Sequence, residues 1–271
     1  MLLRKSCFVV AGLAAVAALP AKAAGDLLVA PTRVVLDGAR GTEVILNNID
    51  SETATYRVSL ELRRMLPDGS IEDVPPESAN AVEAQTLSMI SYAPRRIVLA
   101  PNQPQAIRIG VRAPADLADG EYRVHMLFRA IPDAKPATFE SGQTAGLSIS
   151  LTPIYGVTIP VIVRKGALKA TAALSDPHIS RKDGGAELVL TIAREGNRST
   201  YGRIRVLKPG KATPVFEAKG IAVYPEVNRR EVRLVLDEAV AAGLTGPATI
   251  QYLEDQEAGG RVLAEIQTVI R

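Results

Sequence analysis

The sequence predicts an all-β protein composed of two immunoglobulin-like β-sandwich domains. After residue 26, short segments of alternating apolar and polar residues, rich in Val, Ile and Thr, recur between turn residues. No long amphipathic helical pattern is present. Each half of the chain holds about seven such segments, which is the strand number of an immunoglobulin sandwich.

Residues 1–23 have the pattern of a secretory signal peptide. A basic start at Arg4 and Lys5 is followed by an apolar run and by the cleavage site Ala21-Lys22-Ala23. The apolar run is too short to cross a membrane. We therefore expect export of the chain and removal of this segment.

Removal of the signal peptide changes what the composition implies. Of 32 basic and 29 acidic residues, three basic ones leave with the segment, so the mature chain has no net positive charge. We therefore expect no nucleic-acid partner, because such a partner requires an excess of basic groups. Cys7 leaves as well, so the mature chain folds without disulfides and relies on a buried core.

Motifs for catalysis are missing from the sequence. His125 and His178 lie in different predicted domains, and no metal, nucleotide or nucleophile motif surrounds either of them. We interpret His125 as a sheet residue, and we expect no enzyme activity, no cofactor, no metal and no ATP. A hydrolase that uses only carboxylates, or a carbohydrate-binding module, remains an alternative, although 4% aromatic residues and no Trp disfavour sugar stacking.

The first domain is predicted at residues 24–165. The turn chemistry of 67–70 indicates a hairpin, and the polar, Ala-rich segment 77–86 is compatible with a short helix or a loop. The predicted strands are 27–36, 42–46, 56–62, 97–99, 106–111, 121–131 and 147–163.

The second domain is predicted at residues 166–271, where a new series of β segments begins after Lys165-Gly166. The predicted strands are 168–174, 187–193, 201–207, 215–218, 232–236, 248–253 and 261–269.

The segment 147–163 is too long for an ordinary strand. Its first half alternates between apolar residues and hydroxyl residues. Proline cannot donate a ladder hydrogen bond, so Pro153 and Pro160 favour an edge strand. Such an edge can pair with another chain by strand addition; alternatively, its apolar face covers the core of its own domain.

Four segments, 31–38, 95–108, 119–132 and 147–164, together carry a family resemblance. They resemble the first strand, the middle segment, the sixth strand and the seventh strand of the periplasmic pilus chaperones of the PapD-like family. The resemblance covers residues 27–165, whereas the rest of the chain matches only in length and strand number. It implies a periplasmic location and the same two-sandwich fold.

The resemblance also implies a protein partner and a set of binding residues. Chaperones of this family lend their seventh strand to an incomplete pilin or fimbrial subunit, and Leu147, Ile149, Leu151 and Pro153 match its apolar positions. Arg33 matches the arginine that holds the subunit's C-terminal carboxylate through charge-assisted bonds. Without the surrounding match, Arg33 would be interpreted as a surface arginine.

The chain departs from the family pattern at one anchor position. Pro160 stands where the family has a lysine on the seventh strand, and Lys165 is the nearest replacement along the sequence. Glu121 and Arg164 match two members of the family's interdomain ion-pair set, and Asp255 is a candidate for the third.

The sequence therefore predicts a periplasmic chaperone that stabilises fimbrial subunits by donor-strand complementation, without ATP. An outer-membrane usher is a further candidate partner. The alternative is a structural or adhesive β-sandwich surface protein that has no chaperone activity.

Overall fold

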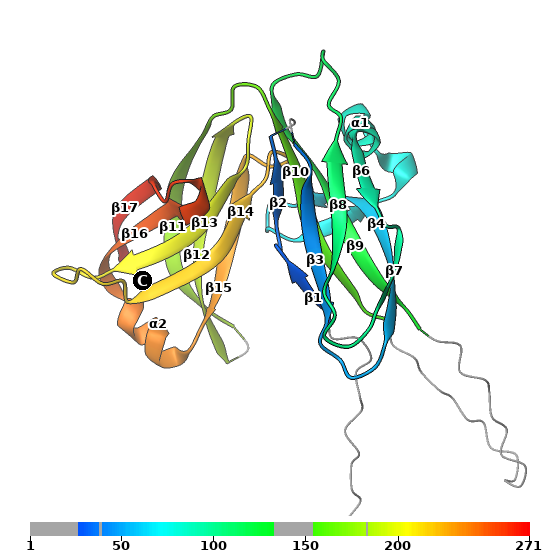
Figure 1. Ribbon diagram of the computed structural model, residues 1–271. Helices are drawn as coiled ribbons and strands as arrows, with labels where there is room; N and C mark the ends of the chain where they lie inside the picture. Colours follow the sequence, from blue (N-terminus) through cyan, green and yellow to red (C-terminus); the bar gives the residue numbers. More distant parts are fainter. Residues whose placement is uncertain (1–26, 38–39, 133–153, 183) are drawn as a thin grey trace, which may run out of the picture.

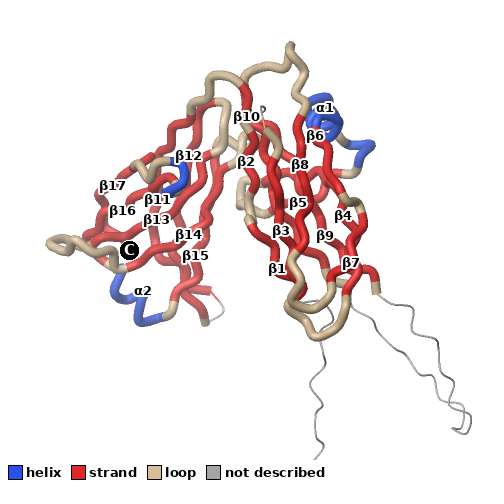
Figure 2. The backbone as a smooth tube through the Cα atoms, in the orientation of Figure 1, coloured by secondary structure: helices blue, strands red, loops and turns tan. Residues whose placement is uncertain are grey.

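The computed structural model describes residues 27–37, 40–132, 154–182 and 184–271. Two β-sandwiches lie side by side (Figure 1). Strands make up most of both, and the helices are short and peripheral (Figure 2). The predicted all-β fold class is confirmed. The predicted signal peptide, residues 1–23, lies outside the described residues.

The first sandwich contains ten strands and two short helical segments. In chain order they are β1 (Leu27–Ala30), β2 (Val34–Leu36), β3 (Thr42–Asn48), β4 (Ala54–Met65), β5 (Ile71–Val74), η1 (Pro76–Ser78), α1 (Ala81–Met89), β6 (Ile90–Ala93), β7 (Arg96–Leu99), β8 (Gln105–Val111), β9 (Gly120–Ile131) and β10 (Gly156–Lys165).

The second sandwich begins after a short connection. Its elements are β11 (Ala170–Lys182), β12 (Gly185–Gly196), β13 (Thr200–Leu207), β14 (Phe216–Val223), β15 (Arg229–Leu236), α2 (Glu238–Leu244), β16 (Gly246–Glu254), η2 (Gln256–Ala258) and β17 (Val262–Ile270). A new pair of sheets begins after Lys165, and the predicted division into domains at 165/166 stays a prediction.

The first sandwich consists of two sheets. One has the strand order β1-β3-β8-β6 and the other has the order β2-β10-β9-β4-β5, in which β7 also pairs with β4. The predicted strand 27–36 is in fact two strands, one in each sheet. The chain changes sheets at Pro31-Thr32-Arg33, where proline cannot continue the ladder. β2 then runs parallel to β10.

A tyrosine corner marks the immunoglobulin-like character of the first sandwich. Tyr122 lies near the start of β9, and its hydroxyl donates to the carbonyl oxygen of Ala118 at 2.8 Å. This backward bond from the start of β9 is a hallmark of immunoglobulin sandwiches. Burial raises the pKa of the Tyr122 hydroxyl, so the donor stays protonated.

The second sandwich packs a sheet of order β11-β12-β15 against one of order β14-β13-β16-β17. Each sandwich has its own apolar core. A small third cluster joins them and consists of Met65 and Ile162 from the first sandwich and Ala222 and Tyr224 from the second. The two sandwiches are therefore connected by packed side chains as well as by the chain.

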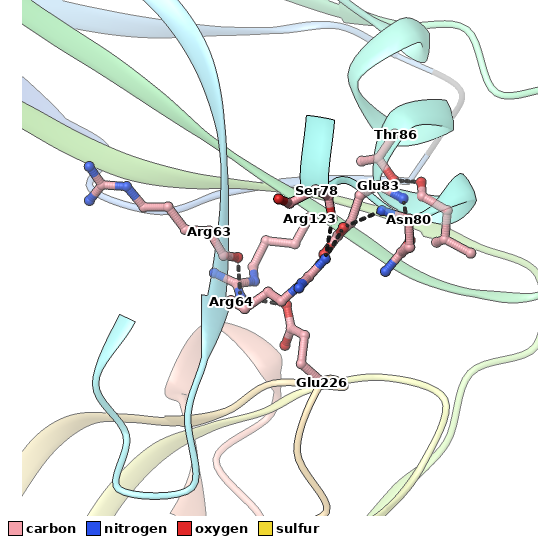
Figure 3. A network of polar contacts seen from close by, with 9 residues as sticks. Arg63, Arg64, Ser78, Asn80, Glu83, Thr86, Arg123 and Glu226 are labelled. Carbon is pink, nitrogen blue, oxygen red and sulfur yellow. Dashed lines mark hydrogen bonds and ion pairs between the residues drawn. The ribbon is translucent and has the colours of Figure 1, made fainter. Parts of the chain in front are cut away.

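Helix α1 begins with a capping box. The Asn80 side chain accepts from the Glu83 N–H, and Glu83 accepts from the Asn80 N–H. Glu83 also binds the Arg64 guanidinium through both oxygens, at 2.6 and 2.7 Å, which ties the helix to β4 (Figure 3). No helix among the described residues is long and apolar enough to cross a membrane.

One lysine in each sandwich fastens a loop through three backbone carbonyls. The Lys165 ammonium donates to Pro114, Ala115 and Leu117, just before β9. The Lys208 ammonium donates to the carbonyls around the start of β16. An ammonium has three donors, so these contacts satisfy both groups.

Candidate functional site

A cleft of about 550 Å³ lies between the two sandwiches. The segment from Pro31 to Val35 forms one wall, together with Arg164. Residues of the second sandwich, including Arg198, Tyr201 and Glu254, form the other wall. The cleft is thus located where the first strand changes sheets.

Arg33 lines this cleft. Side chains alternate along the chain here: Val34 and Leu36 face the core, so Arg33 and Val35 face outward. The Arg33 guanidinium donates to the Tyr224 hydroxyl at 3.0 Å and to the Ser199 hydroxyl at 3.3 Å. It also stacks on the Tyr201 ring, with 4.3 Å to the ring centroid. All these contacts cross to the second sandwich, and all are with neutral groups.

Two other guanidiniums in the cleft have carboxylate partners. Arg164 binds the fully buried side chain of Glu121 at 3.0 Å. Arg198 binds Glu254 at 2.9 Å. None of the ion pairs found among the described residues includes Arg33. Its positive charge is therefore available to an anion that enters the cleft.

The predicted ion-pair residues come together in part. Glu121 and Arg164 face one another on neighbouring strands, and both belong to the first sandwich. Glu121 reaches the second sandwich through its backbone N–H, which donates to the Asn197 carbonyl. Asp255 lines the same cleft as Arg164. The interdomain role of this set stays a prediction.

Strand β10 offers a partly open edge beside the cleft. It pairs with β9 along its whole length, but β2 covers only Val161–Val163 on the other side. Within the described residues, no strand pairs with the remaining side of 156–160. Ile154 and Tyr155, just before this edge, are 57% and 48% exposed. The predicted donor residues Leu147, Ile149, Leu151 and Pro153 lie outside the described residues.

The register explains how Pro160 relates to Arg33. Val161 pairs with Val34, so Pro160 lies next to Arg33 where the open edge ends. Lys165 does not replace the missing lysine there, because its ammonium is bound to the loop before β9.

Sequence reasoning missed a polar group that connects the sandwiches behind Arg33. Arg123 of β9 donates to Glu226 of the second sandwich at 2.5 Å, and its side chain is only 2% exposed. Figure 3 shows Glu226 pointing toward Arg123, with Arg63 and Arg64 close by. The Arg123 guanidinium also stacks on the Tyr224 ring at 3.8 Å.

His125 lies beside Arg123 in the same buried layer. Arg123 approaches its Nε2 at 3.0 Å, so this nitrogen is the acceptor and the neutral imidazole carries its proton on Nδ1. Burial, together with the charges of Arg123 and Arg63, lowers the pKa of His125 to about 3. A neutral imidazole that is 6% exposed fits the prediction that His125 is a sheet residue.

The described residues contain no cluster of three or more His, Cys, Asp or Glu side chains that could hold a metal ion. Among the described residues, the cleft offers the Arg33 guanidinium without a carboxylate partner, hydroxyl groups and aromatic rings, and its lining also includes Glu254, which is paired with Arg198, and Asp255. Such a set suits the recognition of a carboxylate.

Comparisons with known proteins gave similar structures but no sequence relatives. No family model and no curated protein matches the chain. The crystal structure of the YadV chaperone is similar at 14% identity, over 90% of this chain and 100% of that one, with a TM-score of 0.47. The E. coli chaperone DraB gives 15% identity over 91% and 97%, and a TM-score of 0.47. The Pseudomonas aeruginosa CupB2 chaperone gives 16% identity over 90% and 100%, and a TM-score of 0.46.

Proposed function

We propose that this protein is a periplasmic chaperone that binds secreted fimbrial subunits by donor-strand complementation. The segment 147–153 supplies the alternating apolar side chains, and Arg33 holds the C-terminal carboxylate of the subunit. The proposal builds on the resemblance of residues 27–165 to pilus chaperones. It requires neither a cofactor nor a catalytic group.

The observation that carries the proposal is the position of Arg33 at the end of the open edge of β10. A strand added along 156–160 meets β2 at Val161, and Arg33 lies at this point with neutral partners only. An incoming chain that ends there places its terminal carboxylate against the guanidinium. Pairing and charge recognition then act on the same chain end.

The energy of capture comes from burial and hydrogen bonding. Each large apolar side chain that enters a groove of the subunit contributes about 1.5–3 kcal/mol. A charge-assisted pair of bonds to the carboxylate adds about 1.5–3 kcal/mol. A few such contacts suffice for stable binding without nucleotide hydrolysis.

The test is capture of secreted proteins by the mature chain in its native periplasm, followed by identification by mass. The variants are Arg33→Ala, Ile149→Ala and Leu151→Asp. The controls are Arg108→Ala, an exposed arginine on the outer face of β8, and Val235→Asp, on a valine that is 81% exposed in the second sandwich.

We expect the wild type and both controls to retain a small secreted β protein, and the three variants to retain much less of it. Equal retention by Leu151→Asp would remove the donor strand from the proposal. Equal retention by Arg33→Ala would remove the carboxylate anchor. Polymers of the chain itself, with no captured subunit, would favour the structural or adhesive alternative.

A further inference from the structure

We infer that Tyr224, held in place by Arg123 and Glu226, is a positioning residue for Arg33 and tunes its affinity for a carboxylate. The inference rests on the proposed function, since it concerns the same binding group. It assigns part of the anchor to the second sandwich and to residues that touch no ligand.

The four residues form a stack that crosses the interface three times. Arg33 of the first sandwich donates to the hydroxyl of Tyr224 in the second. The Tyr224 ring lies against Arg123 of the first sandwich, and Arg123 binds Glu226 of the second. We call these residues the interface stack.

Each member of the stack has a distinct physical task. Arg123 is nearly fully buried, so it needs Glu226 as a counter-charge. Two guanidiniums lie near one aromatic ring, Arg123 at 3.8 Å and Arg33 at 5.6 Å from its centroid. Neutralisation of Arg123 by Glu226 lowers the repulsion between these two like charges and lets Arg33 stay close.

The Tyr224 hydroxyl and the Tyr201 ring restrict the Arg33 side chain before any ligand arrives. A flexible arginine loses rotamer freedom when it binds, and a guanidinium that is already ordered loses less. The contacts with Tyr224 and Ser199 leave further N–H donors for a carboxylate. Tyr224 therefore preorganises the anchor without occupying it.

The experiment separates recognition of the carboxylate from strand pairing. The probe is a synthetic peptide of alternating Thr and Val with a Lys pair at its N-terminus, made with a free C-terminal carboxylate and with a C-terminal amide. The readout is the ratio of the two affinities for the full mature chain, measured by fluorescence anisotropy. A loosened fold lowers the affinities for both peptides, whereas loss of the anchor lowers only the affinity for the free acid and therefore the ratio.

The main variants are Tyr224→Phe, which removes one oxygen and keeps the ring against Arg123, and Glu226→Gln, which removes the charge at a residue that does not contact Arg33. Arg33→Ala defines a ratio without the anchor. The matched controls are Tyr92→Phe, a tyrosine in the opposite sheet of the first sandwich, and Glu231→Gln, an exposed glutamate that pairs with Arg233. Melting temperatures show that each variant is folded.

We expect the wild type to bind the acid about tenfold tighter than the amide. Tyr224→Phe and Glu226→Gln each lower this ratio by about three- to fivefold, and both controls keep it.

Two outcomes overturn the inference, and they differ in what they mean for the function. If Arg33→Ala abolishes the ratio while Tyr224→Phe and Glu226→Gln keep it, the positioning role is wrong and the anchor remains. If the wild type itself does not prefer the acid, the carboxylate anchor of the proposed function is wrong, and the positioning role falls with it.

Discussion

Three guanidiniums of the two sandwiches are compensated in different ways. Arg123 has a carboxylate partner in Glu226. Arg194 instead donates to backbone carbonyls, including those of Gly196 and Arg198, and burial lowers its pKa. Arg33 has neutral hydroxyl partners and lines the open cleft. Arg33 is less buried than Arg123 and Arg194, for which a charge without a partner would cost several kcal/mol.

At the same scale, His125 predicts how stability depends on pH. Its pKa is about 3 in the folded protein, against 6.5 for an unperturbed histidine, so between these values the unfolded chain binds more protons. Stability therefore falls as pH decreases below 6.5, by up to about 1.4 kcal/mol per pH unit. The Arg123 and Arg63 charges oppose protonation, while Glu61 on the neighbouring strand lies opposite His125.

Urea unfolding of the wild type and His125→Gln between pH 4 and pH 7 measures this contribution. Glutamine can still accept from Arg123 but does not titrate, so the variant should lose less stability in acid. His178→Gln is the control, because that imidazole is exposed. Parallel profiles for the wild type and His125→Gln would contradict the assignment.

Single residues also show how far sequence reasoning reaches. The resemblance of a local segment to a known strand is enough to predict Arg33 as an anchor. Its partner Tyr224 is 191 positions away, and Glu226 is 103 positions from Arg123. No local pattern marks such contacts, because they arise only from the relative position of the two sandwiches.

Among the elements, local chemistry decides which predictions succeed. The residues of 67–70 predict a hairpin turn, and the turn is found between β4 and β5. Strand β11 extends well past the predicted 168–174. The prediction ends too early because the register shifts between Ser175 and His178, which interrupts the alternation of the sequence. Helix α2 is missed by sequence reasoning, as seven residues are too few to show a helical period.

The β4–β5 hairpin is an element that we expect to brace the two sandwiches. The carbonyl of Pro67 accepts from the Glu231 N–H at 2.8 Å. Gly69 has φ of +85°, and a Cβ there would collide with the Arg230 guanidinium. Gly210 has a similar φ of +75° but no neighbour within 4 Å of such a Cβ. The two glycines are thus a matched pair.

Gly69→Ala should therefore destabilise the protein more than Gly210→Ala. The unfavourable φ costs about 1 kcal/mol at either position. Displacement of the Arg230 guanidinium, at Gly69 alone, disturbs its hydrogen bond to the Ala222 carbonyl and adds about 1 kcal/mol. Chemical denaturation of both variants measures the difference, and equal losses would show that the hairpin does not bear on the second sandwich.

Across the whole molecule, two closed cores meet through a small apolar cluster. Ile159 and Ile162 lie on opposite faces of β10, at 2% and 0% exposure. Ile159 belongs to the core of the first sandwich, whereas Ile162 packs in the cluster with Tyr224. One strand thus contributes one isoleucine to the core of the first sandwich and another isoleucine to the cluster that joins the sandwiches.

Replacement of these isoleucines should separate the two contributions. Each change to alanine costs about 2–5 kcal/mol. Hydrogen exchange should show that Ile159→Ala loosens the first sandwich, whereas Ile162→Ala also loosens β14 of the second, which carries Ala222 of the cluster. If Ile162→Ala affects the first sandwich alone, the cluster does not couple the two parts.

The two loop-fastening lysines have a consequence for the chemistry of the surface. Lys165 and Lys208 each direct three ammonium protons to carbonyl oxygens, and a reagent can reach either nitrogen only after these bonds break. An acylated amine keeps one N–H donor, so the modification leaves at least two of the three carbonyls without their partner. In the folded chain, acylation is thus directed to exposed lysines such as Lys219. Acylation of Lys165 or Lys208 therefore reports that the loop before β9 or the loop before β16, respectively, has opened.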